Sequence, residues 1–199
     1  PALPLPLTAV GVDVARGGSD QTSIARVWGG RTVGPLACVP GRMTPDGNSV
    51  LTLLLQAVAD NPEAVAWIDT IGVGAAVYDL ARSGTVPLAN VRAFVASEGT
   101  ERTCKNGLMR FQNVRSAAWW WVREFLDPEG GPEETRLALP PDSQLAADLT
   151  APRLRSLAGG VIQVEPKDSV GKGSDWGIRQ RLGRSTDRAD AVVEALWPG

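Results

Sequence analysis

Apolar residues at every second position open the chain. Over residues 8–15, three valines fall on one face of an extended strand, and Asp13 falls on the opposite face among small residues. Two further strands are predicted over 22–28 and 31–38, joined at Gly29-Gly30, a dipeptide typical of tight hairpins. We therefore expect the domain to begin with three antiparallel strands.

Beyond residue 40, helical and strand-like patterns alternate. Helical spacing predicts helices over 50–60, 72–82, 113–126, 142–149 and 185–197, with hydroxyl or amide caps at Asn48, Ser49, Ser185 and Thr186. Short apolar runs predict strands over 64–68, 91–95, 136–139 and 161–165, and residues 166–184 form a Pro-, Gly- and Lys-rich stretch. This order favours one α/β domain with a mixed sheet and helices on both faces.

Composition agrees with a single globular domain. The 199 residues are 43% hydrophobic and 21% charged, a size and balance that suit one hydrophobic core. Neither a membrane-spanning apolar run nor a signal peptide is present, so a soluble, cytoplasmic protein is expected. The Pro-alternating residues 1–7 suggest an interdomain linker, which places the domain at 8–199 and further protein upstream.

The absence of histidine narrows the possible chemistry. Without it the chain has no Ser-His-Asp or Cys-His nucleophile and no histidine-zinc site. The two cysteines, Cys38 and Cys104, lack the spacing of a zinc site, and ordinary thiols are expected. Any hydrolysis must therefore rest on carboxylates. The net charge of −2 means that a nucleic-acid partner would need a local basic patch.

Carboxylates stand at three positions suited to metal ions. Asp13 lies on the first strand, Asp69 directly follows a buried strand, and Asp190 lies in the first turns of the last helix, three residues after Asp187. Phosphodiester hydrolysis by two cations about 3.5–4 Å apart needs such converging carboxylates. Taken alone, Asp69 is also a plausible turn former and Asp187 a plausible helix-start residue. A carboxylate at Asp13, inside an apolar strand, is costly unless it is paired or bound to metal.

Three segments carrying these acids resemble motifs of the nuclease domain of tailed-phage terminase large subunits. Residues 11–22 resemble its first motif, an Asp followed by a glycine-rich hairpin with a second Asp, here Asp20, and a Thr. Residues 68–74 are similar to the second motif, an apolar strand that ends in Asp and is followed by two glycines. Residues 183–191 are similar to the closing motif, whose last Asp is catalytic.

The resemblance covers nearly the whole chain and implies a ribonuclease H-like fold. It implies a metal-dependent endonuclease that cuts concatemeric viral DNA into genome lengths in the cytoplasm of the infected host, using two Mg or Mn ions. Asp13, Asp69 and Asp190 take the catalytic and ligand roles, Asp187 a supporting one, and whether Asp187 and Asp20 touch the ions directly stays open. The implied partners are double-stranded DNA, an upstream packaging ATPase domain, the small terminase subunit and the portal. No G-x-x-x-x-G-K-[ST] phosphate loop occurs, so the motor lies elsewhere.

Basic residues gather just before the last helix. They offer a DNA-binding surface, although Asp168 and Asp175 dilute the run and ordinary solvated loop charge is an equal interpretation. The cluster comprises Lys167, Lys172, Arg179, Arg181, Arg184 and Arg188.

Other functions fit parts of the pattern. A Holliday-junction resolvase would use the same fold and a similar paired-acid helix. An actin- or sugar-kinase-type nucleotide-binding domain shares the sheet, but that fold needs two domains and the chain holds one. A dinucleotide site at Gly72-Val73-Gly74 lacks the third small position of the fingerprint, which falls on Val77. A non-catalytic module that docks DNA or the portal would have scattered acids, so convergence of Asp13, Asp69 and Asp190 discriminates between the classes.

Overall fold

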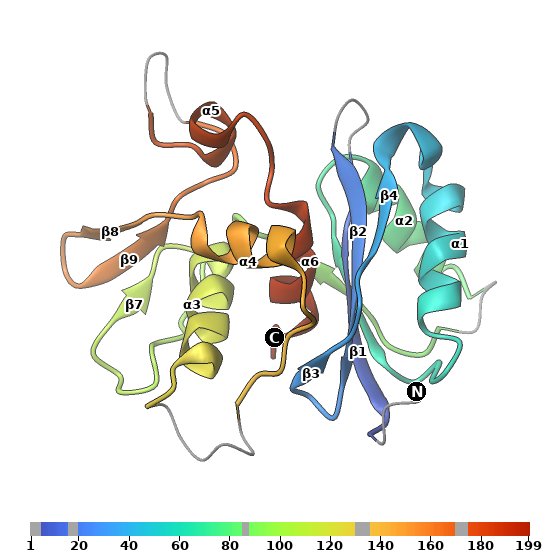
Figure 1. Cartoon of the computed structure of the whole chain (residues 1–199), viewed down its shortest axis with the longest axis horizontal. Helices are drawn as coiled ribbons and strands as arrows, with labels where there is room; N and C mark the ends of the chain where they lie inside the picture. Colours follow the sequence, from blue (N-terminus) through green and yellow to red (C-terminus); the bar gives the residue numbers. More distant parts are fainter. Residues whose placement is uncertain (1–4, 16–19, 85–87, 130–135, 170–174) are drawn as a thin grey trace.

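A computed structural model describes residues 5–15, 20–84, 88–129, 136–169 and 175–199 (Figure 1). Its strands are β1 (Leu7–Asp13), β2 (Gln21–Trp28), β3 (Thr32–Val33), β4 (Ala37–Pro40), β5 (Val65–Asp69), β6 (Val91–Phe94), β7 (Arg110–Phe111), β8 (Leu154–Leu157) and β9 (Val161–Val164). Its α-helices are α1 (Gly47–Ala57), α2 (Val73–Arg82), α3 (Val114–Leu126), α4 (Ser143–Thr150), α5 (Ile178–Leu182) and α6 (Asp187–Ala195), and a short 3₁₀ helix spans Gly41–Met43.

A mixed six-stranded sheet forms the centre of the molecule. The strand order is β3-β2-β1-β5-β6, with β4 also paired to β2. Strands β1 and β2 are antiparallel, whereas β1, β5 and β6 run parallel to one another. The mixed sheet with an antiparallel start is therefore as the sequence predicts.

The third predicted strand, 31–38, is divided into two pieces. Strands β3 and β4 both pair with β2, but the step from Val33 to Ala37 lies opposite the shorter step from Val27 to Ile24. One extra residue therefore bulges between them, where Pro35 has no backbone N–H to continue the ladder.

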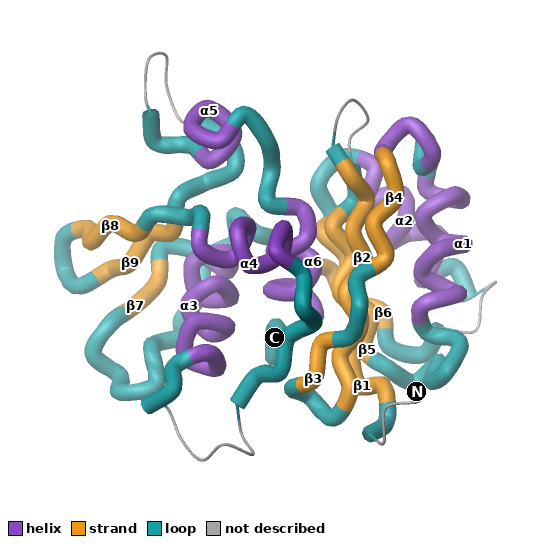
Figure 2. Tube along the Cα trace, in the orientation of Figure 1, coloured by secondary structure: helices purple, strands orange, loops and turns teal. Residues whose placement is uncertain are grey.

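Helices cover both faces of this sheet (Figures 1 and 2). Val10, Val12 and Val14 pack with α1 and α2 in one core cluster, which also contains Leu54 and Val77. The opposite face packs against α6, in a second cluster that also includes α3. Strand alternation therefore directs the valines of β1 to one layer and Asp13 to the other.

A single glycine sets how closely α6 approaches the sheet. A Cβ on Gly11 would lie 2.1 Å from the carbonyl oxygen of Ala191 and 2.4 Å from the backbone nitrogen of Ala195. Because Gly11 has no side chain, the backbone of α6 rests directly on β1. The acidic residues of α6 are thereby brought beside the end of that strand.

A small three-stranded sheet lies beyond α6 and α3, in the order β7-β9-β8 (Figure 1). The sequence predicts β9, but β7, β8 and α5 carry no clear periodic signal. The strand predicted over 136–139 is wrong, since Ala138 makes only an isolated bridge with Thr32. No helix in the described ranges is long and apolar enough to cross a membrane.

One predicted helix start is shifted, and at another the predicted cap residue makes no capping bond. Helix α1 is capped by Asp46, whose carboxylate accepts the Ser49 N–H at 2.9 Å, so Asn48 and Ser49 lie inside the helix. Helix α6 begins at Asp187 after Thr186, but the Thr186 hydroxyl makes no capping bond. It donates to the Asp190 carboxylate at 2.7 Å instead, because that buried acid lies one turn further along the helix.

Candidate metal centre

Asp13 and Asp69 end two neighbouring parallel strands. Strands β1 and β5 pair Val12 with Ile68, so the aspartates that follow lie at the same edge of the sheet. Val12 and Ile68 belong to the core on the α1 side, and both aspartates therefore point toward α6. The Ile71 N–H donates to the Asp69 carboxylate at 3.1 Å, which holds it at the strand end.

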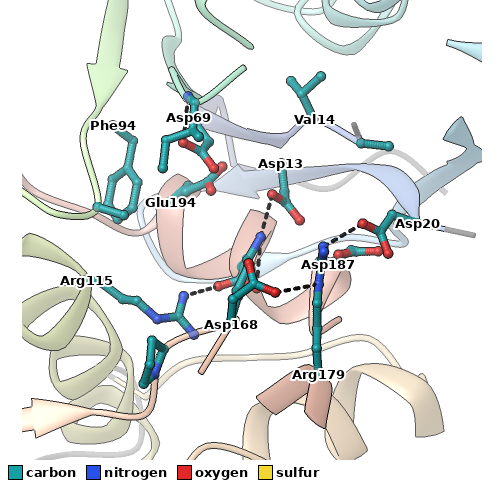
Figure 3. A pocket seen from close by; sticks show the side chains of 16 residues that line it. Asp13, Val14, Asp20, Asp69, Phe94, Arg115, Asp168, Arg179, Asp187 and Glu194 are labelled. Carbon is teal, nitrogen blue, oxygen red and sulfur yellow. Dashed lines mark hydrogen bonds and ion pairs between the residues drawn. The ribbon is translucent and has the colours of Figure 1, made fainter. Parts of the chain in front are cut away.

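A pocket of about 270 Å³ opens at this edge (Figure 3). Its acidic lining residues come from several elements: β1 and β5 supply Asp13 and Asp69, and the segment before β2 supplies Asp20. Helix α6 supplies Asp187, Asp190 and Glu194 from its inner face, and Asp168 comes from the segment after β9. The structure thus brings together all four of the predicted acids, Asp13, Asp69, Asp187 and Asp190.

The tightest cluster includes one residue that sequence reasoning missed. One carboxylate oxygen each of Asp13, Asp69 and Glu194 lie within 4.8 Å of one another. Glu194 is only 2% exposed although its side chain is ionisable. The signal was available, because Asp187, Asp190 and Glu194 follow an i, i+3, i+7 spacing that places all three on one helix face.

Asp190 is instead engaged by cations. Its carboxylate lies 2.6 Å from the Arg115 guanidinium and 3.4 Å from the Lys167 ammonium. The same ammonium lies 2.8 Å from Asp13, so Lys167 bridges the two acids. Lys167 follows β9 and Arg115 begins α3, so both cations come from the side of the small sheet.

The pKa of Asp190 is shifted downward, whereas the pKa values of Asp13 and Glu194 are shifted upward. Burial by itself would raise the pKa of Asp190, but the charges of Lys167 and Arg115 override it and hold that pKa at about 2. Burial raises the pKa of Asp13 to about 8 against the opposing charge of Lys167. Burial, and then the charges of Asp13 and Asp69, raise the pKa of Glu194 well above its usual value. The positive charges of Lys167 and Arg115 therefore outweigh burial at Asp190, whereas burial prevails at Asp13 and Glu194.

The donors suit a hard divalent cation. All are carboxylate oxygens, the ligands that Mg and Mn prefer over soft sulfur or nitrogen donors. One oxygen of Glu194, Oε2, is buried without a hydrogen-bond partner among the described residues. The residues that are present therefore fit an ion of this class.

Asp20 and Asp187 lie at the outer part of the pocket. The Gln21 N–H donates to Asp187 at 3.0 Å, and Arg179 pairs with Asp20 at 2.5 Å. Figure 3 shows these side chains apart from Asp69 and Glu194. Both acids are therefore held in place by protein partners.

The described basic residues of the predicted cluster pair with several different carboxylates. Lys167 lies in the pocket, and Lys172 lies outside the described residues, as do residues 16–19 of the first motif. The other members are each paired with an acid: Arg179 with Asp20, Arg181 with Glu165, Arg184 with Asp148, and Arg188 with Asp142. Their contact with DNA stays a prediction.

Solved structures similar to this chain are nuclease domains of phage terminases. A point mutant of the large terminase subunit domain gp2c from bacteriophage Sf6, with calcium, has a TM-score of 0.73 at 19% identity and covers 96% of this chain and 89% of its own. A mutant of the Sf6 gp2 nuclease domain with manganese and β-thujaplicinol has a TM-score of 0.68 at 18% identity, covering 94% and 87%. The large terminase nuclease from thermophilic phage G20c, with magnesium, has 0.56 at 16%, covering 98% and 82%.

At these identities the comparison establishes the fold. The chain has the ribonuclease H-like fold of terminase nuclease domains, as the sequence resemblance predicts. No protein-family model matches the sequence, and no curated protein matches it.

Proposed function

We propose that this chain is a metal-dependent endodeoxyribonuclease, the nuclease domain of a tailed-phage terminase large subunit that cuts concatemeric viral DNA during packaging. The observation that carries the proposal is the convergence of Asp13 and Asp69 at adjacent strand ends, in a pocket with further acids from α6. Shared fold with solved terminase nucleases supports the same activity. A docking module would have scattered acids, so this convergence favours catalysis.

The pocket residues have distinct tasks in hydrolysis. Mg or Mn, when bound, supplies a Lewis acid that activates water and stabilises the leaving oxygen. Asp13 and Asp69 would hold the ion from the rigid ends of the sheet, and Asp190 and Asp187 would extend the acidic lining for a second ion. Lys167 and Arg115 keep Asp190 ionised, and Arg115 orients it through a 2.6 Å contact. Lys167, 24% exposed at its side chain, is placed to meet a DNA phosphate at the pocket mouth.

The partners follow from the same proposal. DNA would be held by local cations, since the net charge of −2 provides no general attraction. Lys167 and Arg179 are the basic residues of the predicted cluster that line the pocket. The upstream packaging ATPase, the small terminase subunit, the portal and the cytoplasm of the infected host complete the proposed setting.

Ion dependence is the direct test. The chain should cut supercoiled plasmid with added Mg or Mn and leave it intact in chelator, since an all-oxygen acidic site needs a hard cation. An exposed-acid variant, Asp79→Asn on the outer face of α2, should cut like the parent. Cutting in chelator would contradict the proposal. Preference for a four-way junction over linear duplex would indicate a resolvase instead.

A further inference from the structure

Glu194 is buried in the pocket with an unused oxygen. It lies one helical turn after Asp190 on α6, and its residue is 2% exposed. Its Oε2 atom has no hydrogen-bond partner among the described residues. Leaving a buried carboxylate oxygen unpaired is costly, so such an atom is retained where something else satisfies it.

The surroundings of Glu194 indicate which species satisfies it. One of its oxygens groups with oxygens of Asp13 and Asp69 within 4.8 Å. An ion with Mg–oxygen distances of about 2.1 Å sets its ligands at most about 4.2 Å apart, so small side-chain movements would close the shell. Lys167 contacts Asp13 and Asp190, and no ion pair with Glu194 occurs in the described parts of the chain. Glu194 has no ion-pair partner among the described residues, and a bound cation would fill that role.

Asp190, the residue matched to the family's closing motif, differs from Glu194 because its carboxylate has several polar partners. Arg115, Lys167 and the Thr186 hydroxyl already occupy its two oxygens at 2.6, 3.4 and 2.7 Å. It is absent from the group of ligand atoms formed by Asp13, Asp69 and Glu194. Both of its oxygens are thus already engaged by protein groups.

We infer that Glu194 is a direct ligand of the first metal ion, with Asp13 and Asp69, and that Asp190 in this state positions Lys167 and Arg115. Helix α6 thus supplies its first ion ligand one turn later than the motif resemblance implies. The inference rests on the proposed metal-dependent nuclease function and specifies its ion site.

Manganese binding without DNA tests the inference by calorimetry and by the metal-induced rise in melting temperature. Glu194→Gln keeps the shape and removes the charge, and it should weaken Mn affinity by about tenfold or more. Asp190→Asn should weaken Mn affinity less than Glu194→Gln does. The matched control, Glu63→Gln, removes an exposed glutamate just before β5 and should bind Mn like the parent.

The outcomes separate this inference from the proposed function. If Asp13→Asn loses Mn binding while Glu194→Gln retains it, or if Asp190→Asn loses more than Glu194→Gln, the role of Glu194 is overturned and the nuclease proposal stands. If the parent binds no Mn, both fail. Should Glu194→Gln not fold, Mn-soaked crystals of the parent decide: an anomalous peak bonded to Glu194 supports the inference, and one away from it overturns it.

Discussion

The large and small sheets contribute opposite charges to one pocket. The large sheet and the helix packed on it supply Asp13, Asp69 and Glu194. The region of the small sheet supplies Lys167, after β9, and Arg115, at the start of α3. The acids project from strand ends and from a helix held in contact with β1, so their positions are fixed by the backbone. The cations reach the pocket on long side chains, whose geometry can adjust.

This difference indicates that the two sides of the site have different tasks. A metal ion requires ligands placed within a few tenths of an ångström, which rigid elements provide. Neutralising the remaining acids and contacting phosphate require charge but less exact placement, which lysine and arginine provide. Substitutions on the two sides should therefore have effects of different kind and size.

The largest effect is expected on the large-sheet side. Asp13→Asn and Asp69→Asn each remove a proposed ion ligand, and since losing only a supporting contact costs 10–100-fold, we expect cutting to fall by more than about 100-fold. Plasmid cleavage rates in Mn measure it, with melting curves to establish that both variants fold. Cleavage near the parental rate in either variant would remove these residues from the ion site.

Loss of Lys167 should affect stability before activity. Lys167→Met leaves Asp13 and Asp190 without their shared cation, and breaking a buried pair costs roughly 3 kcal/mol or more. In chelator at pH 8 the melting temperature should therefore fall, and Mn should restore more of it than in the parent because the ion replaces the missing charge. Thermal unfolding with and without Mn measures this; equal Mn responses in both proteins would show that Lys167 and ions act independently.

Metal-free stability should decline as pH rises. Burial raises the pKa of Asp13 from 3.8 to about 8, so the folded state holds a proton that the unfolded state has released. That contribution is complete below about pH 4 and is lost as pH rises through 8; one pKa unit corresponds to about 1.4 kcal/mol, so the change from pH 5 to 8 is on the order of 4 kcal/mol. Glu194 acts in the same direction. Asp13→Asn should flatten the profile in chelator, and an unchanged slope would assign it to other groups.

The smallest effect is expected at the outer cation. Arg179 is about one-third exposed at its side chain and pairs with Asp20 and Asp168, so Arg179→Gln should cost less than about 1 kcal/mol of stability. If it contacts phosphate, DNA affinity should drop a few-fold at low salt, with a shallower salt dependence by about one unit. Fluorescence anisotropy at several salt concentrations measures both quantities; an unaltered salt slope would place DNA elsewhere.

The sequence alone predicted the site residues of the large-sheet side better than those of the small-sheet side. The alternation around Asp13 and the apolar run before Asp69 are local signals, and parallel pairing of β1 and β5 then joins them. Lys167 and Asp13 are 154 residues apart, and no local pattern reports their 2.8 Å contact. Arg115 and Glu194 are charged residues within amphipathic helices, where a charge is usually read as part of the solvent-facing side. The short strands β7 and β8 offer too few residues for a period to show.

The close approach of α6 to β1 at Gly11 leaves the acids of α6 little freedom to move relative to the sheet. A methyl group at this position would meet the α6 backbone at 2.1 Å, so accommodating it would require α6 to shift by about an ångström, whereas metal–ligand distances vary by about 0.2 Å. Such a shift would carry the acids of α6 out of register with those of β1 and β5 while leaving every one of them in the chain. The distance between the acids of α6 and those of β1 and β5 thus depends on a residue that has no side chain and takes no part in the chemistry.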